Sequence, residues 1–360
     1  MENQGSTRAK KEYRVFIGSY ADAAQPGIYS YRMRIQDGQC QMELLATESQ
    51  IANPSFLDVD KERGLLFAVS ETGDGHIVSY RVNADTGELK RISEQATLGS
   101  SPCHLLRMDG ENAVLCVNYM GGNASAFSFH EVTGQLTPAF ASVKHEGHGP
   151  NPSRQEGPHP HSSWLDPSGR FVFVVDLGID RICRYRVDVA TKAMVRDGEV
   201  AVSAGAGPRH LVFHPSGRFV YVVNELGSTV TAFAYHQGGG EMHELETVST
   251  LPIGFTGTNT AAAIRISHDG RFLYVSNRGD DSIATFAVDE TSGRLSPIGH
   301  ESTKGLVPRD FNLTPDSRCL LAANQESDSI TAFAIDPTTG APRFVGEVAS
   351  ISHPTCIQIV

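Results

Sequence analysis

The stretch PRHLVFHPSGRFVYVVNELGSTVTAFAYH (208–236) decides the fold, because the chain repeats it. It combines an apolar alternating run, a turn (HPSGR), a β-branched and aromatic run (RFVYVV), a polar turn (NELGS) and a second alternating run. A repeat of about 50 residues is typical of propeller blades rather than of shorter solenoid units. Three close copies and two weaker ones lie at 160–188, 261–289, 308–336, 54–83 and 102–130.

Each repeat predicts a four-stranded antiparallel sheet. Alternation of period two with Val, Ile, Phe and Tyr indicates strands, and clusters of Gly, Asp, Asn and Ser indicate turns. A short fourth run closes the unit, often after TGEL, TGQL or SGRL. Four such strands make one propeller blade. The arginines of the SGR and DGR turns (Arg170, Arg218 and Arg271) are expected to link neighbouring blades.

The two ends of the chain supply a seventh blade. SHPTCIQIV (352–360) matches the first strand of a repeat, and YRVFIGSYADAAQPGIYSYRM (13–33) matches the second and third strands. Joining them closes the ring and removes exposed sheet edges. The sequence therefore predicts an all-β fold: a single seven-bladed β-propeller over residues 12–360, closed by its N- and C-terminal strands. Residues 1–11 are expected to be a disordered tail.

Composition narrows the environment and the partners. The formal net charge is −11 and no basic stripe offsets it, which argues against nucleic acid. No apolar run is long enough to span a membrane, and the polar N-terminus has no secretory signal. Six scattered cysteines without CxxC spacing indicate reduced thiols and a cytoplasmic protein. A closed propeller can stand alone, so a monomer or a weak homo-oligomer is expected.

Two positions of each repeat should line one mouth of the central channel. They are the entry to the first strand, just after the leading Pro, and the end of the second strand, because antiparallel strands reverse direction each time. An anion at this mouth would explain why several arginines converge there. The consecutive blades from 158 to 336 place His161, Arg209, Glu225, Arg278, Arg309 and Gln325 at these positions.

Further substrate contacts are expected from His159, His104 and Tyr119, which lie at or beside the same positions. Taken singly, an Arg at a strand end is more often a solvated turn residue, and Glu225 could be only an ion-pair partner of Arg209. His159 and His161 could hold zinc on one side of a strand, but His159 lies between two prolines and no matching ligands follow. We expect no metal and no cofactor.

The chain resembles the bacterial 6-phosphogluconolactonases of the seven-bladed propeller lactonase family, which also includes the fungal carboxy-muconate cyclases. The resemblance runs from about residue 13 to 360. It is carried by GAGPRHLVFHPSGRFVYVVNELGSTV (205–230), GPHPHSSWLDPSGRFVFV (157–174), SNRGDDSI (276–283) and PRDFNLTPD (308–316). It implies a lactonase or cyclase that acts on a small anionic lactone without a metal.

The resemblance also implies roles for single residues. The active-site His of the family falls on His161, its neighbouring Arg on Arg209, its carboxylate on Glu225 and further arginines on Arg278 and Arg309. The chain departs from the compact bacterial enzymes in a longer segment before His161. We refer to residues 144–159 as the insertion; it adds His145, His148, Arg154 and His159, which are expected to form a lid near the mouth.

A hydrolytic mechanism follows as a hypothesis. His161 would be the general base on water, and Arg209 and Arg278 would hold the oxyanion or an anionic group of the substrate. Glu225 would orient these groups or serve as the acid. The substrate expected first is 6-phosphogluconolactone, in the pentose phosphate pathway, but a free sugar lactone and a muconolactone also suit Arg. A carboxymuconate cyclase and a non-catalytic binding scaffold are the alternatives.

Overall fold

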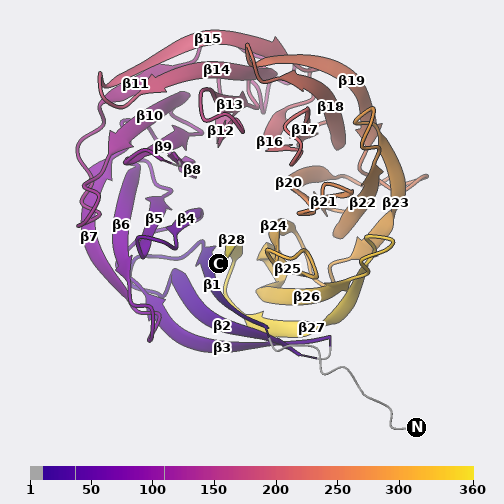
Figure 1. The fold of residues 1–360 in the computed structure, drawn as a ribbon, viewed down its shortest axis with the longest axis horizontal. Coiled ribbons are helices and arrows are strands. Elements are labelled where there is room, and N and C mark those ends of the chain that lie inside the picture. The colour runs from indigo at the N-terminus through magenta and orange to yellow at the C-terminus, as the bar shows by residue number, and fades with distance from the viewer. Residues whose placement is uncertain (1–10, 37, 109) are drawn as a thin grey trace.

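A computed structural model describes residues 11–36, 38–108 and 110–360 of the chain. It is a ring of seven four-stranded antiparallel sheets around a central channel (Figure 1). This confirms the predicted all-β, seven-bladed propeller. The innermost strand of each sheet lies nearest the channel and the fourth forms the rim (Figure 1). Residues 1–10, most of the expected tail, lie outside the described residues, and the first strand begins at Lys11.

We number the blades in chain order from blade 1 to blade 6 and call the last one the closing blade. Blades 1 to 3, from the inside outwards, are β4 (Leu57–Asp60), β5 (Leu65–Ser70), β6 (His76–Val82) and β7 (Leu89–Ala96); β8 (Pro102–Met108), β9 (Ala113–Asn118), β10 (Asn123–Ser128) and β11 (Ala141–Lys144); β12 (Pro160–Leu165), β13 (Val172–Asp176), β14 (Arg181–Asp188) and β15 (Ala193–Ala201).

Blades 4 to 6 continue the same order, and a single turn of 3₁₀ helix follows β25. They are β16 (Pro208–Phe213), β17 (Phe219–Asn224), β18 (Thr229–His236) and β19 (Glu241–Ser249); β20 (Thr260–Ile266), β21 (Phe272–Arg278), β22 (Ser282–Val288) and β23 (Leu295–Ser302); β24 (Pro308–Leu313), β25 (Cys319–Asn324), η1 (Gln325–Ser327), β26 (Ser329–Ile335) and β27 (Pro342–Ser350).

The closing blade joins the two ends of the chain, as predicted. Its strands are β28 (Pro354–Ile359), β1 (Lys11–Ser19), β2 (Ile28–Gln36) and β3 (Gln39–Glu48). The last strand pairs antiparallel with the first, Val15 opposite Ile359 and Ile17 opposite Ile357. Val15, Ile17, Ile357 and Ile359 of this ladder belong to one apolar cluster, and Phe16 and Cys356 belong to another.

The core lies between neighbouring blades rather than inside one sheet. The second strands are buried on both faces, so β5 (LLFAVS) and β17 (FVYVVN) are apolar over most of their length. Their side chains interleave with those of the next blade; Val175 of blade 3, for example, shares a cluster with Val222 of blade 4. The fourth strands are half exposed and mixed in polarity, as rim strands should be.

Hydrogen bonds explain the pattern that the repeats share at the first turn. The Asp166 carboxylate accepts the backbone N–H groups of Arg170 and Phe171, both at 2.8 Å, which closes the DPSGR turn. The guanidiniums of Arg170, Arg218 and Arg271 each donate to a backbone carbonyl of the following blade. The predicted role of these arginines as links between blades is confirmed.

Candidate active site

The first strand of a blade carries a β-bulge one residue after its leading Pro. In β12, β16 and β24 the ladder skips His161, Arg209 and Arg309, and in β8 it skips Cys103. A bulge leaves its residue unpaired and turns the side chain away from the regular alternation. All four residues line one buried cavity on the channel axis. The other lining residues are Ser55, Phe56, Glu71, His210, Asp310 and Thr355.

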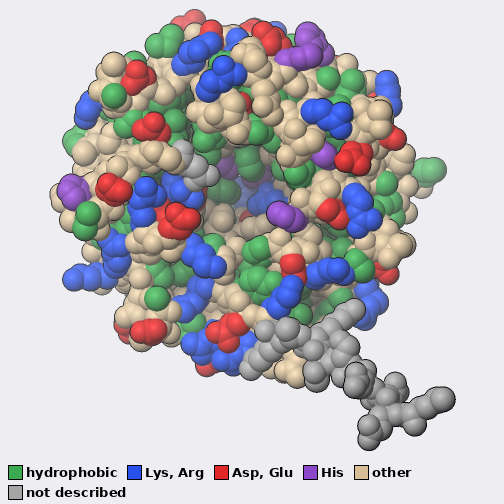
Figure 2. Space-filling view, viewed as in Figure 1, with side chains coloured by type: hydrophobic (Ala, Val, Ile, Leu, Met, Phe, Trp, Pro, Cys, Tyr) green, Lys and Arg blue, Asp and Glu red, His purple; other side chains and the backbone are tan. Residues whose placement is uncertain are grey.

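The ring face drawn in Figure 2 is hollowed at its centre, and both signs of charge are mixed around its rim. Arg209 and Arg309 line the cavity of the candidate site on a chain whose net charge is −11. Such a local positive site attracts an anion against the overall field.

Three guanidiniums surround one buried carboxylate at the edge of the cavity. Glu225 follows β17 directly, and its side chain is 4% exposed. Its Oε2 lies 3.1 Å from Nε of Arg209 and 2.8 Å from Nη2 of Arg278, and its Oε1 lies 2.5 Å from Nη2 of Arg154. Burial raises the pKa of Glu225, but Arg278 and Arg209 outweigh it and hold that pKa well below its usual range. Glu225 is a carboxylate with surplus positive charge around it.

Arg209 is held rigidly in the wall of the cavity. Its side chain is almost fully buried, and its Nη1 donates to the Ala262 carbonyl at 2.8 Å. Burial and the neighbouring charge of Arg278 lower the pKa of Arg209 to about 9. It therefore stays protonated at neutral pH. A fixed, desolvated cation of this kind stabilises a negative charge more strongly than a solvated one.

His161 is the imidazole that the β-bulge of β12 directs into this cavity. Its ring is buried, with Tyr119 and His210 at its edges at centroid distances of 5.6 and 5.3 Å. Its Nδ1 is buried and has no hydrogen-bond partner among the described residues. Burial, followed by the charge of Arg209, holds the pKa of His161 well below its usual range. The imidazole is thus neutral and able to accept a proton.

Arg309 reaches the cavity from the opposite side with its own partners. Its Nη2 donates to the Tyr20 hydroxyl at 2.8 Å, and that hydroxyl donates to Oε2 of Glu71 at 3.1 Å. The Ser55 hydroxyl also hydrogen-bonds to Glu71. Burial alone would lower the pKa of Arg309, but Tyr20 and Glu71 raise it. Arg309 is a second permanent cation, separate from the Glu225 cluster.

The structure brings together five of the nine predicted residues by direct contact or shared cavity, and places Tyr119 and His159 beside them. The five are His161, Arg209, Glu225, Arg278 and Arg309. Tyr119 meets His161 with its ring edge and accepts a hydrogen bond from Arg154 at 3.4 Å. His159 stacks on Tyr119 at 4.4 Å, and its two ring nitrogens lie near the Tyr119 carbonyl and Glu156.

His104 and Gln325 lie away from the cavity lining. The His104 ring stacks on Phe56 at 4.1 Å and lies 5.3 Å from the Trp164 ring, while the neighbouring Cys103 faces the cavity. Gln325 begins η1, is partly exposed and donates to Glu326 at 2.7 Å. The equivalent residue of blade 4, His210, does line the cavity, and its ring lies 5.4 Å from the ring of His104. Direct substrate contact by these two residues remains a prediction.

The insertion is tied down to blade 3 at several points. His145 does not line the cavity: it is fully buried, with Nδ1 2.6 Å from Asp176 and Nε2 2.7 Å from the Tyr185 hydroxyl. His148 is exposed. The insertion instead sends Arg154 to Glu225. Sequence reasoning placed Arg154 near the mouth but did not select it, because only the fold shows which carboxylate it meets.

Other cavity residues were also not selected from the sequence. Tyr20, Glu71, Ser55 and Thr355 stand at the predicted ring positions, and their repeat register was the signal that could have found them. Among the described residues, no three His, Cys, Asp or Glu side chains cluster as metal ligands would. The absence of a metal remains a prediction. In the part of the chain that the structure covers, no helix is long and apolar enough to cross a membrane.

Comparisons with known proteins agree with this fold. A family model described as "Lactonase, 7-bladed beta-propeller" matches residues 14–359. The 6-phosphogluconolactonase of Bacillus subtilis is 35% identical over 84% of this chain and 86% of its own. The solved periplasmic gluconolactonase of Pseudomonas aeruginosa is 32% identical, with a TM-score of 0.90 over 97% of this chain and 99% of its own. A Lactobacillus plantarum protein has the same identity and TM-score, over 97% and 100%.

Proposed function

Because the chain belongs to the seven-bladed β-propeller lactonase family, we propose that it hydrolyses a small anionic sugar lactone, 6-phosphogluconolactone before others. The observation that carries this proposal is the juxtaposition of the neutral, buried His161 with the guanidiniums of Arg209 and Arg278. A base and a fixed oxyanion-binding group are the two elements that lactone hydrolysis needs.

The steps assigned to this site are those of ester hydrolysis. His161 accepts a proton from a water molecule, whose oxygen attacks the lactone carbonyl carbon. Arg209 and Arg278 stabilise the oxyanion that forms. The bond from the carbonyl carbon to the ring oxygen then breaks, and protonated His161 returns its proton to that oxygen. Glu225 is assigned to orient the two arginines, since a carboxylate among three guanidiniums is a poor acid and a weak base.

The excess positive charge supports an anionic substrate. Glu225 is shared by Arg154, Arg209 and Arg278, so these groups together carry more positive than negative charge. Arginine binds phosphate and carboxylate in a bidentate manner. With 6-phosphogluconolactone as substrate, we place the protein in the pentose phosphate pathway and in the cytoplasm. The location is an inference from the substrate, and the P. aeruginosa relative is periplasmic.

Acid release from a panel of lactones tests the proposal. The panel consists of 6-phosphogluconolactone, gluconolactone and a carboxymuconolactone. Each lactone is assayed with wild type, His161→Ala and Arg209→Ala. The control variant is His268→Ala, an exposed residue at the other end of a blade. We expect kcat to fall about 10²- to 10⁴-fold in His161→Ala and to be unchanged in His268→Ala. Full kcat in His161→Ala would remove His161 as the base. Turnover of only the muconolactone would favour the cyclase.

A further inference from the structure

Arg154 differs from the two other arginines at Glu225 in its exposure and in its origin. Its side chain is 38% exposed, against 4% for Arg209 and 12% for Arg278. It comes from the insertion, whereas the other two come from the first and second strands of blades 4 and 5. Arg154 is therefore the one cation of this cluster that meets both solvent and the buried carboxylate.

The backbone that carries Arg154 is fixed by its neighbour. Gln155 is fully buried, and its Nε2 donates to the Leu177 carbonyl and to Asp180, each at 2.8 Å. Its Oε1 accepts the backbone N–H of Asn151 at 3.1 Å. The segment is thus held at the base of the side chain, while the guanidinium lies at the end of a flexible stem. This arrangement allows the head group to move without moving the insertion.

The guanidinium of Arg154 has spare donors. Among the described residues only its Nη2 makes hydrogen bonds, to Glu225 at 2.5 Å and to the Tyr119 hydroxyl at 3.4 Å. Glu225 keeps Arg209 and Arg278 on its other oxygen when Arg154 leaves. The ion pair of a partly exposed Arg is also weak compared with a buried one. Arg154 can therefore turn toward an incoming anion while Glu225 stays neutralised.

We propose that Arg154 is a specificity-determining residue that binds the phosphate of a phosphorylated lactone while Arg209 and Arg278 act at the reacting carbonyl. This inference rests on the proposed lactonase function and deepens it. A phosphate offers several oxygens to the planar fork of Arg, and the hydroxyl of an unphosphorylated lactone does not. Arg154 would then separate the two substrate classes without taking part in bond breaking.

The test compares two substrates in wild type, Arg154→Gln, Arg154→Lys and a control, Arg343→Gln, on the exposed face of β27. For Arg154→Gln we expect kcat/KM to fall ~10- to 100-fold with 6-phosphogluconolactone and to change less than about threefold with gluconolactone. Arg154→Lys should recover part of the loss, and Arg343→Gln should match wild type. Equal losses with both substrates, or no loss with either, would overturn the inference.

A binding measurement separates this inference from the lactonase proposal. Calorimetric titration with 6-phosphogluconate and with gluconate needs no turnover. If wild type hydrolyses neither lactone, the lactonase proposal fails. If Arg154→Gln binds 6-phosphogluconate as tightly as wild type does, the role of Arg154 fails. We expect the variant to lose affinity for 6-phosphogluconate alone, with an unchanged melting temperature that shows an intact fold.

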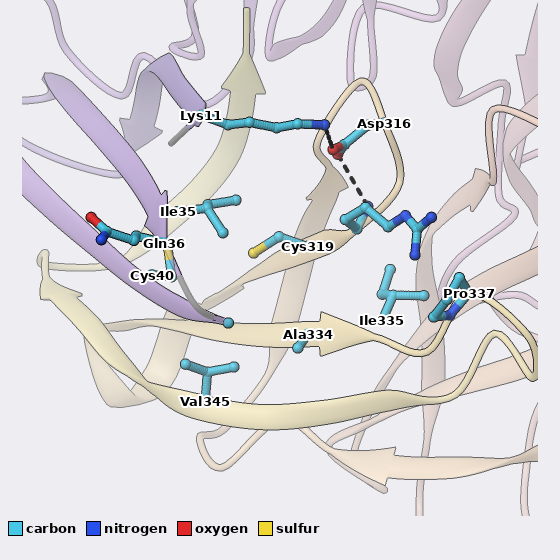
Figure 3. A pocket seen from close by; sticks show the side chains of 12 residues that line it. Lys11, Ile35, Gln36, Cys40, Asp316, Cys319, Ala334, Ile335, Pro337 and Val345 are labelled. Atoms are coloured by element: carbon cyan, nitrogen blue, oxygen red, sulfur yellow. Dashed lines mark hydrogen bonds and ion pairs between the residues drawn. The ribbon is translucent and has the colours of Figure 1, made fainter. Parts of the chain in front are cut away.

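A different observation concerns two cysteines at the seam between blade 6 and the closing blade. Cys40 on β3 and Cys319 at the start of β25 line one pocket of ≈ 350 Å³ (Figure 3). Cys319 belongs to the apolar cluster of this seam, and Cys40 packs against it. The Cys319 thiol lowers the pKa of Cys40, and the Cys40 thiol raises the pKa of Cys319. Cys40 is partly exposed, whereas the other five cysteines are buried.

We propose that Cys40 and Cys319 are a peroxide-sensitive pair that forms a disulfide across this seam. The Cys40 thiol loses a proton, and the thiolate attacks the peroxide: the O–O bond breaks, a sulfenic acid forms, and the hydroxide that leaves takes up that proton to give water. The Cys319 thiol then displaces a second water to form the disulfide, so two thiols and one hydrogen peroxide give one disulfide and two waters. The link would tie β3 covalently to β25, in addition to the ladder that joins β1 to β28.

Peptide mapping after treatment with hydrogen peroxide tests this pair. We expect a crosslinked peptide joining residues 40 and 319, two hydrogens lighter than its parts, and a melting temperature raised by about 3 °C or more until dithiothreitol is added. Cys40→Ser should abolish both effects, and Cys183→Ser should keep them. A sulfinic acid on Cys40 without a crosslink, or no change at either cysteine, would overturn the proposal. Neither result depends on lactonase activity.

Discussion

Replacing Glu225 with Gln tests how the arginine cluster is held together. Gln keeps the volume of the side chain, so no cavity forms, but it removes the one negative charge shared by Arg154, Arg209 and Arg278. Removing one partner of a buried ion pair costs about 3–5 kcal/mol, because it leaves buried charge unpaired. Arg154 is more than a third exposed, so its share of this cost is small. The loss is expected from Arg209 and Arg278.

The loss should be measurable as a change in melting temperature. For a chain of 360 residues, about 3–5 kcal/mol corresponds to a fall of about 4–7 °C. The matched control is Glu199→Gln, which also removes a carboxylate contacting two arginines but at an exposed site. The control should lose less than about 1 kcal/mol. Equal melting temperatures for wild type and Glu225→Gln would refute the argument that this carboxylate neutralises the cluster.

The pH dependence gives a second check on the same variant. The pKa of Glu225 is held below its unfolded value, so its contribution is complete above about pH 4.5 and is lost as the pH falls toward the lowered pKa. The difference in stability between wild type and Glu225→Gln should therefore be constant from about pH 8 to pH 5. It should shrink in more acidic solution. A difference that grows as the pH falls would contradict the assigned sign.

Three further outcomes are expected. Burial and Arg209 lower the pKa of His161, so the imidazole should stay neutral until the solution is more acidic than usual for His. In a pH–rate profile, kcat/KM should therefore stay level from about pH 8 to 6.5 and fall only below that range. A midpoint near pH 6.5 would contradict this. Tyr20→Phe removes the hydroxyl between Arg309 and Glu71, so steady-state assays should show kcat/KM reduced about tenfold at an unchanged melting temperature. A Cβ on Gly178 would lie 2.0 Å from the Gly157 carbonyl oxygen, so Gly178→Ala should lower the melting temperature measured by calorimetry by about 1–4 °C. Gly157 has open space around its Cα, so Gly157→Ala should leave the melting temperature unchanged.

The repeat made the architecture and the ring positions predictable from sequence. Register within the repeat assigned His161, Arg209 and Arg309 to equivalent entries, and the structure places all three on one cavity. The β-bulge at those entries was not predictable, since it depends on how Pro meets the second strand. It places Cys103 on the cavity, whereas the ring of His104 stacks on Phe56.

The repeat could not predict which side chains far apart in the sequence contact each other. Arg154 lies in the insertion, outside the periodic part of the chain, so no register related it to Glu225. The same holds for His145, whose burial against Asp176 and Tyr185 depends on the path of the insertion over blade 3. Local pattern predicts where a strand residue points, whereas contacts of an irregular segment require the folded backbone.

The closing blade has a consequence for the folding of the protein. Tyr20, directly after β1, holds Arg309, and Thr355 of β28 hydrogen-bonds to the carbonyls of Gly18 and Ser55 at 3.2 and 3.0 Å. The cavity wall is therefore complete only when β1 and β28 have paired in the closing blade. A folding intermediate with an open closing blade would carry His161 and the Glu225 cluster but lack part of the cavity wall. Closure of the ring is thus a condition for assembling the site.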